Sequence, residues 1–196
     1  MIEYAQNSNV LEIKYLSIDR GNAVLFQGLN LTLNPGDMVW VKGNNGIGKT
    51  SLLKCCAGLL RASSGDVFWN GKDITKQEMG YAAFLGHHDA HKPSLTPTET
   101  LEFWRSLYDN DTPKEIELCL KRVALWERRN QSVKTLSAGQ SRRLSLARIY
   151  MSNAPLWILD EPSAAMDEQG RKLIGSLLKE HIASKGSVLL ASHGAP

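Results

Sequence analysis

The sequence predicts an α/β protein built around a mainly parallel β-sheet. Short apolar runs, MVWVK (residues 38–42), PLWILDEP (155–162) and SVLLASH (187–193), resemble strands buried on both faces, which are typical of parallel sheets. Helical patterns separate the runs, as parallel pairing requires. A glycine-rich segment, GNNGIGKT (43–50), follows the first run and precedes a helix. That context is typical of a phosphate-binding loop.

Length and composition indicate one ordinary globular domain over residues 1–196. The chain is 42% apolar and 22% charged, with a formal net charge of +3. Its basic residues are scattered, which argues against a nucleic-acid partner. No apolar run approaches the roughly 20 residues of a spanning helix, and the N-terminus does not resemble a secretory signal. Three cysteines without a metal-binding or disulfide pattern suggest a reducing compartment.

The first third is predicted to be mostly β-structure. Alternation and turn signals favour strands at VLEIKYL (10–16), LNLTL (29–33), MVWVK (38–42), GDVFWNG (65–71) and YAAFL (81–85), with a turn at NPGD (34–37). The segment SLLKCCAGLL (51–60) is predicted to be a buried helix that ends near Gly58.

The middle of the chain is predicted to be helical and inserted into the sheet. Thr96 with Glu99 forms a capping box with proline at the first helical position, and Thr112 with Glu115 repeats the pattern. We expect helices over 98–108, 114–125 and 136–151. Asp167 is expected to cap a later helix, whose apolar residues fall on one face: Leu173, Ile174, Leu177, Leu178 and Ile182.

The glycine-rich segment has the residues that bind a nucleotide phosphate. Its glycines let consecutive backbone N–H groups converge on phosphate oxygens. Lys49 is expected to reach the β- and γ-phosphates, and the Thr50 hydroxyl to bind Mg²⁺. The expected contact residues are Gly43, Asn44, Asn45, Gly46, Ile47, Gly48, Lys49 and Thr50. The alternative is a glycine-rich turn that binds nothing.

Polar residues at the ends of two later strands complete a candidate catalytic site. Ligand sites of open α/β sheets lie at the carboxyl ends of the strands. We expect Asp160 to hold the Mg²⁺ shell and Glu161 to act as general base toward water. His193 is expected to bond the γ-phosphate or that water. The alternative is that these residues are merely solvated strand ends.

The segment LSAGQ (136–140) adds a second helix start that could hold an anion. Ser137 with Gln140 forms a capping box, and by itself it could be only a cap. The phosphate loop, LSAGQ, LWILDEP, SAAMD and SH follow one another in an order that resembles the ATP-binding cassette (ABC) family. The resemblance implies a P-loop, RecA-like core over about 1–86 and 155–196. It also implies an N-terminal antiparallel β subdomain and a helical subdomain inserted at about 87–154.

The resemblance also implies how ATP is held. Two chains would form a head-to-tail dimer around two ATP molecules, each with Mg²⁺. Ser137, Gly139 and Gln140 of one chain would close on the nucleotide held by the other's phosphate loop. Ser51 would touch the α-phosphate, and Asp167 would lie near the dimer seam. Hydrolysis at Glu161 would reopen the dimer.

Four positions depart from the family pattern. Ala138 stands where a glycine is usual. His88 stands where the family has a glutamine that contacts the metal. Arg20 replaces the aromatic residue that stacks on adenine, and a guanidinium plane can also stack on a base. The chain also stops three residues after His193, where the family continues with more sheet and a helix.

Within this family, the chain is most similar to the ATPases of cytochrome c maturation systems, the so-called haem exporters. The likeness rests on LFQGLNLTLNPGD, SSGDVFWNGKDI and LGHHDAHKPSLTPTETLEFW. It implies a peripheral protein on the cytoplasmic face of the inner membrane, bound to an integral-membrane permease subunit. ATP turnover would drive release of a haem-loaded chaperone. The sequence gives neither the transported substrate nor its direction.

Other interpretations stay open. A soluble ABC ATPase acting on nucleic acid or ribosomes is one, and a nucleotide-binding regulatory module with little turnover is another. His87 and His91 are four residues apart and could bind a metal or haem. Phe103, Trp104 and Tyr108 are predicted to lie in the core of the helical part, or else to form a groove for a short helix of the membrane subunit.

Overall fold

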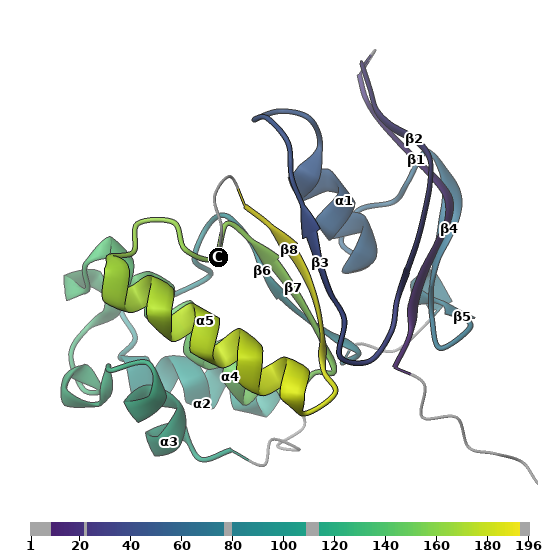
Figure 1. Ribbon diagram of the computed structural model, residues 1–196. Helices are drawn as coiled ribbons and strands as arrows, with labels where there is room; N and C mark the ends of the chain where they lie inside the picture. Colours follow the sequence, from purple (N-terminus) through teal and green to yellow (C-terminus); the bar gives the residue numbers. More distant parts are fainter. Residues whose placement is uncertain (1–8, 22, 77–79, 109–113, 193–196) are drawn as a thin grey trace, which may run out of the picture.

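The computed structural model describes residues 9–21, 23–76, 80–108 and 114–192. Within these ranges the strands form two four-stranded sheets (Figure 1). The first sheet is antiparallel and has the order β2-β1-β4-β5. Its strands are β1 (Leu11–Arg20), β2 (Ala23–Leu33), β4 (Ser64–Trp69) and β5 (Lys72–Asp73). The early part of the chain therefore forms the β-structure that the sequence predicts.

The second sheet is parallel throughout and has the order β3-β8-β7-β6. Its strands are β3 (Met38–Val41), β6 (Ala82–Leu85), β7 (Leu156–Asp160) and β8 (Ser187–Ala191). Every residue of the two central strands, β7 and β8, is buried. The prediction of a mainly parallel sheet is confirmed, and burial on both faces explains why these strands are continuous apolar runs.

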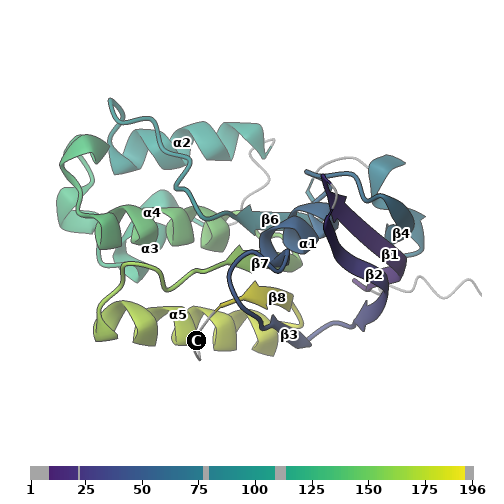
Figure 2. The same ribbon diagram turned by 90° about the horizontal axis from the view of Figure 1, so that it is seen from above.

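Helices cover the parallel sheet on both sides. They are α1 (Lys49–Cys56), α2 (Pro97–Leu107), α3 (Ile116–Arg122), α4 (Ala138–Met151) and α5 (Glu168–Ala183), with 3₁₀ turns at Ile74–Lys76, Trp126–Arg128 and Val133–Thr135. Seen from above, α1 lies between the two sheets, and the other helices lie beyond the parallel sheet (Figure 2). No helix within the described ranges combines the length and apolar character that a membrane span needs.

Two apolar cores lie on opposite faces of the parallel sheet. Trp157 and Leu159 of β7 point into the core shared with α2 to α5. Leu156 and Ile158 of the same strand point into the core shared with α1 and the antiparallel sheet. Successive side chains of a strand alternate between its faces, so one strand anchors both cores and its register is fixed.

Three of the four predicted helix caps are confirmed. Thr96 and Ser137 each form a complete capping box, and the Asp167 carboxylate accepts the Gly170 N–H at 2.7 Å. The fourth, at Thr112, lies outside the described residues. The helix expected over 114–125 is shorter than predicted, because α3 begins at Ile116 with Glu115 as its N-cap and no side-chain cap bond.

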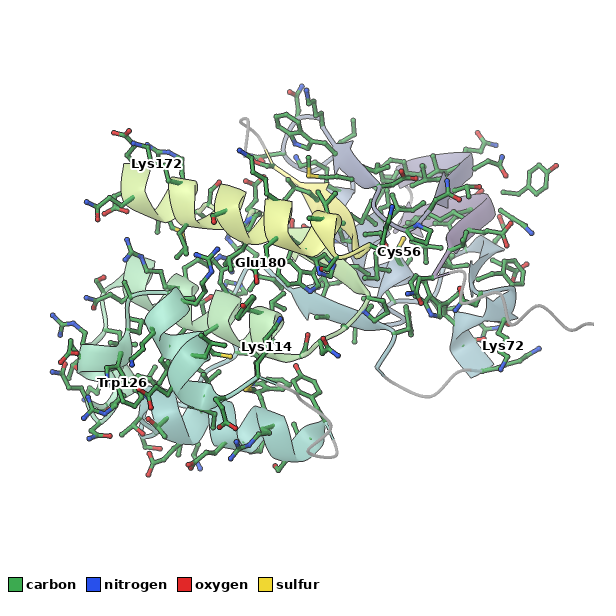
Figure 3. The ribbon with its side chains drawn as sticks, turned by 60° about the horizontal axis from the view of Figure 1, so that its bottom comes forward. Cys56, Lys72, Lys114, Trp126, Lys172 and Glu180 are labelled. Carbon is green, nitrogen blue, oxygen red and sulfur yellow. The ribbon has the colours of Figure 1, made fainter. Side chains whose placement is uncertain are left out.

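The late start of α3 follows from contacts made by the residue before its cap. The ammonium of Lys114 donates to the Tyr150 carbonyl oxygen at 2.8 Å and lies 3.7 Å from the centre of the Tyr150 ring. The Tyr150 hydroxyl donates to Glu180 at 2.8 Å. Figure 3 labels Lys114 and Glu180 at this junction between α3, α4 and α5. These contacts hold Lys114 against α4, and the chain is still extended at Glu115.

The aromatic residues of α2 are only partly buried. Trp104 and Tyr108 pack on the core beside α4, and the Arg148 guanidinium lies 4.4 Å from the centre of the Trp104 ring. Phe103 is 53% exposed and meets Trp104 edge-on, so the prediction that it is a core residue is wrong. Its position on α2 turns it away from the face that packs on α4.

We predict that the stability of the fold decreases below neutral pH through His181. This ring stacks on Trp157 with centroids 4.0 Å apart, and burial lowers its pKa to about 4. An unfolded histidine has a pKa of about 6.5, so protonation favours the unfolded chain below that pH. Between pH 7 and 5 the free energy of unfolding should drop by about 1 to 2 kcal/mol from this residue.

Urea denaturation of the wild type and of His181→Phe at both pH values measures this contribution. Phenylalanine keeps a ring on Trp157 but does not titrate, so the variant should lose less stability than the wild type. His91 also has a pKa lowered by burial and accounts for part of the remaining dependence. Identical pH dependence in both proteins would contradict the prediction.

Candidate functional site

The glycine-rich segment forms a loop between β3 and α1, as predicted. We call residues 43–50 the phosphate loop. Gly43, Gly46 and Gly48 all have positive φ angles, a conformation that side chains disfavour. At Gly48, with φ of 104°, an added Cβ would also lie 2.8 Å from Phe26 Cε2. The loop is therefore curled tightly against β2, and a glycine is required where it enters the helix.

Lys49 lies inside the curl of the phosphate loop. Its side chain is buried, at 7% exposure, and its ammonium donates to the carbonyl oxygens of Gly43 at 2.7 Å and Asn44 at 3.1 Å. These bonds hold the positive charge over the loop, where it would meet a phosphate. Asn44, Asn45, Gly46 and Ile47 are exposed at the rim of the loop, and Ser51 is half-buried in the first turn of α1.

Thr50 and Asp160 come together although they are far apart in the sequence. The Thr50 hydroxyl donates to the Asp160 carboxylate at 2.7 Å, and Asp160 is 2% exposed at the end of β7. Hydroxyl and carboxylate oxygens are hard ligands of the kind that Mg²⁺ prefers. No cluster of three potential ligands from His, Cys, Asp and Glu occurs in the described part of the chain.

Glu161 follows directly and adopts a left-handed backbone conformation, with φ of 48°. Its N–H donates to the Ala191 carbonyl oxygen at 2.8 Å, and its own carbonyl accepts the Ala164 N–H at 3.0 Å. A non-glycine residue in this region costs about 1 to 2 kcal/mol, so surrounding contacts must hold it there. Glu161 directly follows Asp160, the last residue of β7, and therefore lies at the carboxyl edge of the sheet.

Among the remaining candidate residues, Arg20, His88 and His91 lie in the described part of the chain. Arg20 is exposed at the end of β1, in the hairpin that also carries Phe26. His88 is exposed in the segment after β6, with its ring 5.2 Å from that of His87. His91 does not join His87 in a metal site but lies 2.9 Å from the Ser145 hydroxyl. His193 lies outside the described residues.

The second helix start forms a site of its own. The first turn of α4 carries residues 137–140, which we call the signature tip. Ser137, Gly139 and Gln140 line an open pocket together with Arg143 and Asp167, whose side chains pair at 3.2 Å. No residue of the phosphate loop lines this pocket. The phosphate loop and the signature tip are therefore separate surfaces of one chain.

Sequence reasoning missed three polar residues that tie these surfaces together. No motif in the sequence singles out Arg142, Asp89 or Ser145. The structure buries the Arg142 guanidinium between α4, the end of β7 and the segment after β6. The signal available in the sequence was the position of Arg142 in a predicted helix that also carries the apolar residues Leu144, Leu146 and Ile149.

A family model described as ABC transporter matches residues 26–164. The match spans more than two thirds of the chain and includes the phosphate loop, the signature tip and the strand that ends at Asp160. The chain belongs to the ABC transporter family. The order of motifs in the sequence indicates the same family.

Relatives and solved structures agree with this membership. The chain is 42% identical over 187 residues to the cytochrome c biogenesis ATP-binding export protein CcmA of Aliivibrio fischeri, covering 94% of this chain and 92% of the relative. The CcmA of Haemophilus influenzae is 43% identical, with 93% and 88% covered. An ABC transporter ATP-binding protein from Pyrococcus furiosus superposes with a TM-score of 0.83 at 29% identity, covering 95% and 92%. A dimeric ATP-binding cassette bound to ADP and Pi shares the fold, with a TM-score of 0.82 at 21% identity, covering 94% and 88%.

We predict that Lys49→Ala weakens nucleotide binding by roughly 100-fold, because a charged hydrogen-bond donor to phosphate is lost. The overall fold should persist, since the hydrogen bonds of the Lys49 side chain stay within the phosphate loop. Titration with a fluorescent ATP analogue measures the affinity, and circular dichroism checks folding. Lys54→Ala, on the exposed side of α1, is the matched control and should bind normally. ATP binding at wild-type strength by Lys49→Ala would contradict the role given to this lysine.

Proposed function

We propose that this chain is the ATP-hydrolysing subunit of an ABC membrane complex that serves cytochrome c biogenesis. The observation that carries the proposal is the contact between Thr50 and Asp160 beside Lys49, at the carboxyl edge of the parallel sheet. Hydrogen-bond donors to phosphate and a pair of hard oxygen ligands lie together there, as the binding of ATP with a divalent cation requires. The similarity to two CcmA proteins over more than nine tenths of the chain supports the choice of system.

In the proposed site, the chain holds ATP mainly through its phosphates. Backbone N–H groups of the phosphate loop and the Lys49 ammonium would bind the β- and γ-phosphates, and Ser51 the α-phosphate. Thr50 and Asp160 would hold Mg²⁺, which would neutralise charge that develops on the phosphate oxygens. The exposed Arg20 is proposed to stack its guanidinium plane on the base.

Glu161 is proposed as the general base. A water oxygen attacks the γ-phosphorus, its proton passes to the Glu161 carboxylate, and ADP leaves with the electrons of the broken P–O bond. The left-handed backbone at Glu161 supports this role, because strained residues often mark functional sites. His193 is proposed to bond the γ-phosphate, and His88 to stand near the metal in place of glutamine.

The working unit is proposed to be a head-to-tail dimer. Each chain holds a phosphate loop and, in a separate pocket, a signature tip. A two-fold dimer can pair the loop of one chain with the tip of the other, and symmetry then creates two identical ATP sites. The helix N-terminus at Ser137 and Gly139 would bind the γ-phosphate of the partner's nucleotide. Closure binds two ATP molecules, and hydrolysis reopens the dimer.

The membrane partner is proposed to be an integral permease subunit, with this chain bound peripherally at the cytoplasmic face of the inner membrane. Exposed apolar side chains on the helical part, Phe103 and Leu107 of α2 and Leu118 of α3, support a protein contact there. ATP turnover would power release of a haem-loaded chaperone. A short helix of the permease is a suitable occupant for an apolar helical surface.

We predict that Glu161→Gln lowers phosphate release by roughly 100-fold or more, because the proton acceptor is lost. Since ATP binding is retained, the variant should accumulate as an ATP-bound dimer in Mg²⁺-ATP, visible by light scattering after size exclusion. Glu117→Gln, in an exposed ion pair on α3, is the control. Equal phosphate release by Glu161→Gln and the wild type would contradict hydrolysis at this site and favour a regulatory module.

We predict that two inactive variants restore activity when mixed. Lys49→Ala removes nucleotide binding at the phosphate loop, and Ser137→Arg blocks the signature tip. In a mixed head-to-tail dimer both defects fall in one site, and the other site is intact. Random pairing should therefore restore about a quarter of the wild-type rate per chain. Phosphate release from the mixture measures this, and no gain over the separate variants would show that sites are not shared.

A further inference from the structure

Arg142 binds two structural segments that meet at the proposed catalytic edge. Its side chain is 3% exposed. One terminal nitrogen, Nη2, donates to the carbonyl oxygens of Asp160 at 2.6 Å and Glu161 at 2.8 Å. The other, Nη1, donates to the Gly86 carbonyl oxygen at 2.8 Å and to the Asp89 carboxylate at 3.2 Å. A single guanidinium therefore joins α4 to the end of β7 and to the segment after β6.

The contact with β7 fixes the peptide from which Glu161 projects. Two consecutive carbonyl oxygens, those of Asp160 and Glu161, point to the same nitrogen of Arg142. The Glu161 N–H is held separately by Ala191 of β8. Bonds on both sides of Glu161 offset the cost of its left-handed conformation. Because the backbone angles set where the side chain starts, these bonds also set the direction in which the carboxylate leaves the strand.

The contact with the segment after β6 supplies the counter-charge. The Asp89 carboxylate accepts from Arg142 and from the Ser145 hydroxyl at 2.7 Å. The Arg142–Asp89 ion pair places this carboxylate directly against the buried guanidinium and compensates its charge.

We propose that Arg142 is a positioning residue for hydrolysis. It holds the strand end that carries Glu161 and ties it to the helix whose first turn is the signature tip. The inference rests on the proposed role of Glu161 as general base. Arg142 itself touches neither ATP nor water in this scheme and acts through the Asp160–Glu161 backbone. Its planar fork of donors suits this task, whereas lysine offers a single point charge.

Arg148 provides a matched control on the same helix. It is also buried, at 9% exposure, and donates to a backbone carbonyl oxygen, that of Phe84, at 2.7 Å. Its guanidinium stacks on Trp104. It differs from Arg142 in the strand that it contacts, because Phe84 belongs to β6 and Glu161 follows β7. Loss of Arg148 should therefore weaken the fold without moving the base.

The test compares Arg142→Lys, Arg142→Gln and Arg148→Gln by steady-state kinetics with Mg²⁺-ATP. Both Arg142 variants should lose about 10- to 100-fold in kcat, because small displacements of a catalytic group have effects of that size. KM should change by less than about threefold, since the phosphate loop is untouched. Arg148→Gln should keep kcat within about twofold, as expected when only packing is lost. Arg142→Lys keeps the charge and most of the volume, so it is the variant expected to fold.

Hydrogen exchange gives a second measurement that does not depend on turnover. Amide exchange in a peptide covering residues 159–163 should become faster in the Arg142 variants than in Arg148→Gln. Without the bonds from Arg142 to the Asp160 and Glu161 carbonyl oxygens, this strand end opens more often, and opening breaks the bond from the Glu161 N–H to Ala191. In a Glu161→Gln background, Arg142→Lys should cause no further loss of turnover, since it acts through that carboxylate.

The outcomes separate this inference from the proposed function. Wild-type turnover by Glu161→Gln alone would refute the general-base role and with it the proposed function of the site. Equal kcat in Arg142→Lys and Arg148→Gln, or unchanged exchange at residues 159–163, would refute only the positioning role. A loss that appears in KM alone would also overturn it, because it would place Arg142 in nucleotide binding.

Discussion

Burial of β7 on both faces is the constraint on which the rest of this structure depends. Trp157 and Leu159 fill one core, and Leu156 and Ile158 fill the other. A slip of one residue would exchange the two sets, so packing fixes the register against β6 and β8. The strand therefore has to end at Asp160, level with Ala191 of β8. The chemistry of the site starts from that end point.

The charges of Asp160 and Arg142 are buried, and hydrogen bonds compensate both of them. Asp160 is bound by the Thr50 hydroxyl, and Arg142 is bound by backbone carbonyls and by the Asp89 carboxylate. An uncompensated charge at either place would cost several kcal/mol, which a domain of this size could not easily tolerate. These bonds link the phosphate loop to the end of β7, and the end of β7 to α4. In the proposed mechanism, the same bonds therefore serve stability and catalysis.

The chain belongs to the ABC transporter family, and its architecture separates the phosphate loop from the signature tip. The phosphate loop lies at the edge of the parallel sheet, and the signature tip lies at the start of α4. Neither surface encloses a nucleotide by itself. A second copy of the chain supplies what each surface lacks in the proposed head-to-tail arrangement, so that ATP itself becomes part of the interface. Binding energy and subunit contact then depend on each other.

Sequence alone determined the features that depend on neighbouring residues. The sequence predicted the phosphate loop, the caps at Ser137 and Asp167 and the buried strands. Each of these features is set by residues only a few positions apart. Burial of Phe103 was predicted wrongly, since the face of α2 that meets the core is chosen by its partners. Only the tertiary structure revealed that Arg142 reaches Gly86 and Asp160. Bonds between segments 18 and 56 residues apart are decided by how α4 packs on the sheet, which no local pattern encodes.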